Sequence, residues 1–220
     1  MSLTSIVMDL FEQYRTFSQV HPIGGAMATA TVVFPLADVA SQALKHKKVD
    51  WNKVRYTAEL SPLYGIIAHG CVKSGNLVGE YISPHPLAKA ALGPNLWGNV
   101  FNIFFFVNNT VGERTGYQLR EWARHYYSLF HREKTEEGRQ GFLADCRDRV
   151  KHQILDYVSW PEYTKAIIGT FTFWNAFQYA NYSYTPEKMQ TAATLGMTLF
   201  WTVLLSSWSL AGRKKGAAYN

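Results

Sequence analysis

The chain has 220 residues, of which 47% are hydrophobic, and its 22 Lys and Arg against 16 Asp and Glu give a formal net charge of +6. All of these charged side chains lie outside four uncharged stretches: 16–37, 90–112, 166–186 and 189–212. This segregation excludes a disordered protein, a nucleic-acid-binding domain with basic residues spread over one face, and a small disulfide scaffold.

The uncharged stretches are long enough to cross a membrane. Each has 21 to 24 residues, and a helix of about 20 residues spans the hydrocarbon core of a bilayer. A fifth stretch, 60–79, contains only Lys73, whose long side chain can reach an interface. We therefore predict an all-α fold, a polytopic membrane helical bundle of four to five spanning helices, with residues 1–220 as a single membrane domain. The alternative is a large soluble bundle with unusually long buried helices.

The distribution of basic residues predicts how such a bundle is oriented. If all five stretches span, three Lys and Arg fall on one side, in 1–22, 80–89 and 187–188, and 18 on the other, in 45–59, 113–165 and 213–220. The positive-inside rule assigns the second side to the cytoplasm or matrix. Frequent Gly, Ala, Ser, Thr and Asn, including pairs such as Gly75 and Gly79, favour close helix packing. The short turn at 185–188 makes the last two helices an antiparallel pair.

Residues 113–165 form an extramembrane loop between the third and fourth spans. Apolar side chains recur at helical spacing in 117–130 and again in 142–158, so we predict two amphipathic helices there. They have two interpretations of similar weight. They lie on the membrane surface or dock a partner, or they form a solvated hairpin that covers the end of the bundle itself.

Neither a cofactor nor an enzymatic reaction is expected. The seven histidines are scattered without metal-ligand spacing, and we find no nucleophile beside a base. No metal site is predicted, although lipid can occupy grooves between the helices. Residues 1–20 lack the Arg-rich, acid-poor character of a transit peptide, so we expect insertion by internal signals. The ionisable residues within or at the ends of the stretches, Asp38, His69 and Lys73, are functional candidates by default.

Two stripes of amide side chains lie within the uncharged stretches. Asn95, Asn99 and Asn102 occupy one helix face, and so do the three residues Asn175, Gln178 and Asn181. Lipid offers no hydrogen bonds, so these amides must face protein or water. They either bond the helices to each other or line a narrow polar path. We favour helix bonding, because such a contact contributes about 0.6 kcal/mol in membrane proteins.

Residues at both ends of the chain resemble one known family. The opening matches are Tyr14, His21, Pro22, Asp38, Ser41, Gln42, Leu44, Arg55 and Gly65, and the closing matches are Trp174, Ala176, Gln178, Ala180, Asn181, Tyr182, Pro186, Trp201, Leu205 and Ser206. This pattern is similar to the family named for mitochondrial Mpv-seventeen and the peroxisomal membrane protein of twenty-two kilodaltons, over roughly residues 14–70 and 167–208. The resemblance implies a small all-helical protein of the inner mitochondrial or peroxisomal membrane, usually with four spans and sometimes described as a poorly selective channel.

The departures from this pattern separate two hypotheses. Gly93-Pro94 stands where the family has Asp-Gln, Trp174-Asn175 replaces Trp-Pro, Ala68-His69 replaces Gly-Pro, and the 113–165 loop is longer than usual. The lost buried charge and enlarged loop favour a non-catalytic accessory subunit that packs within a larger complex of the mitochondrial inner membrane. Its partners would be lipid and other membrane-protein subunits, and not nucleic acid. The alternative is a small-solute channel of the inner mitochondrial or peroxisomal membrane, lined by the two amide stripes.

Overall fold

A computed structural model describes residues 3–46, 48–130, 147–152, 154–158 and 160–216. The described residues contain helices and no strand, which confirms the all-α prediction. The elements are α1 (Leu3–Val20), α2 (Pro22–His46), α3 (Trp51–Tyr81), α4 (Pro86–Leu92), α5 (Pro94–Arg114), α6 (Leu119–Phe130), the 3₁₀ turn η1 (Leu155–Tyr157), α8 (Trp160–Gly169), the π-helical segment η2 (Thr170–Trp174), α9 (Asn175–Tyr184) and α10 (Glu187–Gly216).

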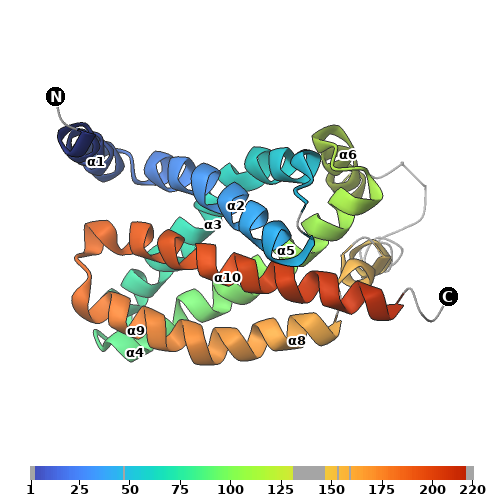
Figure 1. Ribbon diagram of the computed structural model, residues 1–220. Coiled ribbons are helices and arrows are strands. Elements are labelled where there is room, and N and C mark those ends of the chain that lie inside the picture. The colour runs from blue at the N-terminus through green and yellow to red at the C-terminus, as the bar shows by residue number, and fades with distance from the viewer. Residues whose placement is uncertain (1–2, 47, 131–146, 153, 159, 217–220) are drawn as a thin grey trace.

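The long helices form a bundle in which α10 lies between α2 and the α8–α9 segments (Figure 1). The segments α8, η2 and α9 follow one another as a single rod, and α10 returns antiparallel beside it, as the short turn predicts. Helix α2 packs on both α3 and α10, and α5 packs on α3. Helix α1 projects from one end of the bundle and contacts mainly α2.

Prolines set two helix boundaries that the uncharged stretches do not show. The first stretch begins at 16, but α1 ends at Val20 and α2 begins at Pro22. The third begins at 90, yet α4 ends at Leu92 and α5 begins at Pro94. Proline is favoured at the first helical position and disfavours helical geometry in the residue before it, so both breaks fall just ahead of a proline. Helix α1 itself was not predicted, because it carries charges and its apolar pattern is short.

Glycines let the helices touch at the backbone. A Cβ atom added at Gly65 on α3 would lie 2.6 Å from the carbonyl oxygen of Ala26 on α2. One added at Gly93 would lie 2.4 Å from the Cα atom of Gly75. Ala30, next on the same face of α2 as Ala26, is fully buried. This close approach is the packing that the small-residue pairs predict.

The bundle encloses a cluster of aromatic side chains. The ring centroids of Phe34 and Tyr64 lie 4.7 Å apart, and Phe101 packs edge-on against Tyr64 at 5.5 Å. Phe105 extends the cluster along α5. Such offset and edge-to-face pairs each contribute about 0.5 to 1.5 kcal/mol of stability beyond the burial of their area. The cluster therefore holds α2, α3 and α5 together.

One of the two amphipathic helices predicted in the loop is seen almost in full. Helix α6 lies within the expected 117–130, and its Trp122 and Tyr126 pack against the core. In the range expected for the second helix, 147–152 are helical and η1 follows, whereas 142–146 lie outside the described residues. Helix α6 thus packs on α5 and covers one end of the bundle (Figure 1).

Helix α2 supplies the clearest membrane-spanning candidate. Among the described residues, one segment, Pro22–Leu44, is long and apolar enough to cross a bilayer by length and composition. The other stretches exclude charge but are rich in amide and hydroxyl groups. The 90–112 stretch alone contains Asn95, Asn99, Asn102, Asn108 and Asn109, which lower its mean hydropathy. The number of spans therefore stays a prediction.

Candidate functional site

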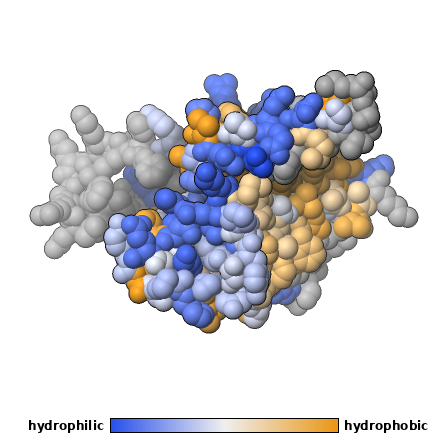
Figure 2. All heavy atoms as spheres, turned by 90° about the vertical axis from the view of Figure 1, so that its left-hand side faces the viewer, coloured by the Kyte–Doolittle hydropathy of each residue, from blue (hydrophilic) through white to orange (hydrophobic). Residues whose placement is uncertain are grey.

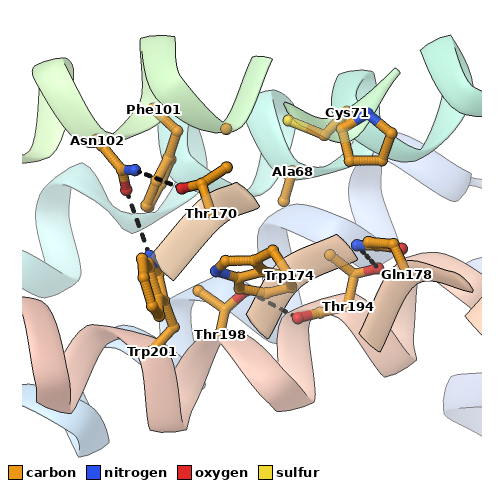
Figure 3. Close-up of a pocket in the computed structure, with 12 residues that line it drawn as sticks. Ala68, Cys71, Phe101, Asn102, Thr170, Trp174, Gln178, Thr194, Thr198 and Trp201 are labelled. Atoms are coloured by element: carbon orange, nitrogen blue, oxygen red, sulfur yellow. Dashed lines mark hydrogen bonds between the residues drawn. The ribbon is translucent and has the colours of Figure 1, made fainter. Parts of the chain in front are cut away.

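A narrow cavity of about 50 Å³ lies in the middle of the bundle, between α3, α5, the η2–α9 segment and α10 (Figure 3). A volume of this size can hold a few water molecules. Its wall combines apolar groups with a few polar ones, and is formed by Ala68, Cys71, Pro94, Gly98, Phe101, Asn102, Thr170, Trp174, Gln178, Thr194, Thr198 and Trp201. Both amide stripes thus contribute to this cavity, together with the two family-motif tryptophans Trp174 and Trp201.

The π-helical segment η2 shapes one wall of the cavity. The Thr170 hydroxyl donates to the carbonyl of Ala166 at 2.9 Å, and Thr172 donates to Ile168 at 2.8 Å. Such back-bonding competes with regular helical bonds and often bends helices. Just before η2, a Cβ atom on Gly169 would lie 2.3 Å from the Trp201 ring, so the glycine makes room for that indole. Single π turns inside α-helices are frequent at functional sites.

Asn102 joins three helical segments across the cavity. Its Nδ2 donates to the Thr170 hydroxyl at 3.0 Å, and its Oδ1 accepts from the Trp201 Nε1 at 3.3 Å (Figure 3). Asn102 and Trp201 are 1% and 2% exposed. The amide therefore ties α5 to η2 and to α10 with both of its polar atoms.

The other two members of the first stripe differ in their partners. Asn95 is buried and donates a short hydrogen bond from Nδ2 to the Oδ1 of Asn175, which joins α5 to α9. Asn99 donates to the backbone carbonyl of Asn95 in its own helix at 2.9 Å. Its buried Oδ1 has no hydrogen-bond partner among the described residues. Two of the three amides thus bridge helices, and the third leaves one acceptor open.

The second stripe bonds α9 to α10. The Nε2 of Gln178 donates to the Thr194 hydroxyl at 3.2 Å (Figure 3). The Nδ2 of Asn181 lies within 3.2 Å of Gln178 Oε1, the Gln190 carbonyl oxygen and the Thr194 hydroxyl. The Nδ2 of Asn175 instead donates to the backbone carbonyl of Phe171 at 2.8 Å. Five of the six amides therefore contact a neighbouring helical segment.

Two opening family-motif residues meet in a buried ionic network. The Asp38 carboxylate lies 3.1 Å from the Lys53 ammonium group, and both side chains are at most 9% exposed. Gln42 and Thr57 each donate to the second carboxylate oxygen at 3.3 Å. Gln42 in turn accepts from the backbone of Asp50, the residue that caps α3. The network thereby fixes the turn between α2 and α3.

The remaining family-motif residues lie at helix ends or on the surface. His21 and Pro22 form the junction of α1 and α2, and Pro186 precedes α10. Arg55 is exposed on α3 and donates to Glu59 at 2.8 Å. The structure therefore brings Asp38 and Gln42 together and, separately, Trp174 and Trp201, whose rings lie 5.9 Å apart.

Two functional-looking residues escaped the sequence reasoning. Asn108 lies on α5 but on the opposite face from the first stripe, and it accepts from Trp122 and Tyr126 of α6 at 2.8 Å each. Lys53 was counted as a loop charge, although it becomes the buried partner of Asp38. Neither residue follows a stripe, and each acquires its partners from segments separate in sequence. No periodicity signal in the sequence marks them.

The described residues contain no group of three or more His, Cys, Asp or Glu that could hold a metal ion. Cys71 lines the cavity as a buried free thiol. No family model, curated protein or solved structure matches the chain. The likeness to the Mpv-seventeen family consequently stays a prediction from the residues that carry it.

Proposed function

We propose that the chain is a non-catalytic integral membrane protein, a polytopic helical bundle of the Mpv-seventeen type that packs as an accessory subunit within a larger complex of the mitochondrial inner membrane. The observation that carries this proposal is that many large apolar side chains are exposed on the helices while polar side chains are buried between them. Sixteen polar or charged residues of the described chain are buried, whereas 27 large hydrophobic ones are exposed. Apolar surface that extends over several helices marks a site of interaction with a membrane or with another protein.

The exposed apolar side chains are distributed over several helices of the bundle. Val32 and Leu36 are more than half exposed on α2, as are Ile168 on α8 and Phe171 on η2, and Phe200 on α10 is half exposed. Figure 2 shows part of this surface as a continuous apolar area beside a hydrophilic one. Lipid tails and the helices of a neighbouring subunit are both apolar, so either would cover such side chains without a cost in solvation free energy.

The hydrogen bonds in the interior favour a packing role over conduction. Five of the six stripe amides use a polar atom on a neighbouring helical segment, and Asn102 uses both of its atoms in this way. Between them remains a cavity of only about 50 Å³. An open path for solutes needs amides that face water along the length of the bundle, so these contacts support a closed, bonded interior.

The accessory role is tested by the size of the particle that contains the protein. Mitochondrial inner membranes solubilised in mild detergent and separated on a native gel should show the chain migrating with a large complex. Cross-linking should then capture partner subunits on the exposed faces of α2 and α8. Migration only as a monomer or small oligomer would refute the accessory role, and recovery in peroxisomal membranes would replace the proposed location by the alternative one.

A small-solute channel is the second candidate, and the open acceptor of Asn99 favours it. The central cavity lies beside a π-helical turn, and the Oδ1 of Asn99 on α5 has no partner in the described part of the chain. Under this alternative, reconstituted bilayers conduct, and replacing Asn99 and Gln178 by Leu alters the conductance. Asn109→Leu is the matched control, because among the described residues that amide bonds its own helix, at the Phe105 carbonyl. Bilayers without conductance would eliminate the channel.

A further inference from the structure

A second hollow, which we call the basic groove, lies where the end of α1, the start of α2, the middle of α3 and the start of α10 meet. Its volume is about 390 Å³, within the range of small-ligand sites. The chemically important residues of its lining are Gln19, His69, Lys73, Glu187, Lys188 and Thr191. The groove is separate from the central cavity, with which it shares no lining residue.

Two lysines line the basic groove. Lys73 is the only charged residue in the 60–79 stretch, and Lys188 is the second residue of α10. In the described part of the chain, neither ammonium group forms an ion pair with a carboxylate. Lys73, Lys188 and Gln19 are all exposed, so their donor groups are open to an ion that enters the hollow. Cations that line a concave surface raise the local concentration of anions, so a bound anion is the expected occupant.

The donors around the groove suit an anion with several oxygen atoms. Lys73, Lys188 and Gln19 line one hollow, and the single carboxylate of Glu187 leaves its formal charge at +1 with His69 neutral. The wall is held in place by Asn76, whose Nδ2 donates to Gln190 of α10 at 3.2 Å. A phosphate group has enough acceptor oxygens to meet all three donor side chains at once.

We propose that the basic groove binds a phosphate group, carried either by an anionic phospholipid headgroup or by a free phosphate ion. Lys73 and Lys188 supply the positive charge, and Gln19 supplies a neutral donor. Glu187 opposes binding and restricts the groove to anions that can avoid its carboxylate. This site does not depend on the accessory role, since a channel or a solitary bundle would carry the same groove.

The test uses the full-length protein and two probes. Inorganic phosphate is titrated into protein held in a detergent with an uncharged headgroup, and binding is followed by phosphorus NMR. Separately, nanodiscs of phosphatidylcholine with phosphatidylglycerol are analysed by native mass spectrometry for retained anionic lipid. The variants are Lys73→Gln/Lys188→Gln, the control Lys48→Gln, which removes one positive charge from the opposite end of the bundle, and Glu187→Gln.

At least one probe should bind saturably to the wild type and to Lys48→Gln. The double variant should bind it at least about tenfold more weakly, and Glu187→Gln about fivefold more tightly. Binding of inorganic phosphate identifies a free anion as a ligand, whereas binding of phosphatidylglycerol alone identifies a headgroup. The proposal is overturned if neither probe binds, if Lys48→Gln weakens binding as much as the double variant, or if Glu187→Gln leaves the affinity unchanged.

Discussion

Replacing Asn108 by Ala tests whether α6 is held on the bundle by one buried amide. The Oδ1 of Asn108 accepts from Trp122 and Tyr126 at 2.8 Å each, and its Nδ2 donates to the Tyr64 hydroxyl at 3.2 Å. The backbone carbonyl of Asn108 also accepts from Tyr56 at 3.0 Å, and that bond survives the substitution. Asn108→Ala therefore deletes three side-chain hydrogen bonds and leaves three donors or acceptors without a partner.

The loss should be large because the asparagine is only 1% exposed. Each intramolecular hydrogen bond contributes about 1 kcal/mol net, and a buried group left unsatisfied costs more. We therefore expect the free energy of unfolding to fall by about 3 kcal/mol. Much of this loss should appear as local release of α6, because two of the three bonds join α6 to α5.

The measurement is unfolding in mild detergent combined with hydrogen exchange of the α6 backbone amides. Asn109→Ala is the matched control: Asn109 follows Asn108 on α5, but its Nδ2 bonds only the Phe105 carbonyl in its own helix. The control should lose less than about 1 kcal/mol and keep α6 protected. Equal losses in the two variants, or unchanged protection of α6 in Asn108→Ala, would refute the reasoning.

Three further predictions concern packing, the ionic network and pH. Gly65→Ala should lower the free energy of unfolding by about 2 kcal/mol, because its methyl group meets the backbone of α2, whereas Gly70→Ala, with nothing within 4 Å, should be neutral or stabilising in the same denaturation assay. Lys53→Met should cost about 3 kcal/mol by leaving Asp38 buried without its cation, and adding Asp38→Asn should recover most of that loss in a double-mutant cycle. Failure of the second substitution to recover stability would contradict a dominant ionic role. Burial raises the pKa of Tyr126 above its ordinary value of 10.0. Because folding favours the neutral phenol, this side chain stabilises the fold below pH 10, and that contribution is lost as the pH rises through the pKa of the folded state. The phenolate absorbance difference between wild type and Tyr126→Phe should therefore appear above pH 10 in the folded protein, and a step at pH 10 would show an exposed ring.

The central site was only partly predictable. The amide stripes are visible in the sequence because helical periodicity places residues three and four apart on one face. Periodicity cannot show that Asn102 meets Trp201, because that contact joins residues 99 positions apart. Nor does it reveal Asn108, which points away from the stripe and gains its partners when α6 folds back onto α5.

The sequence alone determined that the chain is all helical and where most of its helices lie. Charge-free stretches, helical periodicity and prolines act locally, over one or a few turns, so they can be read along the chain. Only the tertiary structure decided that Lys53 turns inward to Asp38, that Gly65 brings α2 and α3 to backbone contact, and that a basic groove forms where α1, α3 and α10 converge. These features depend on which distant helices meet and at what depth, and that choice is made by the packing of the whole bundle.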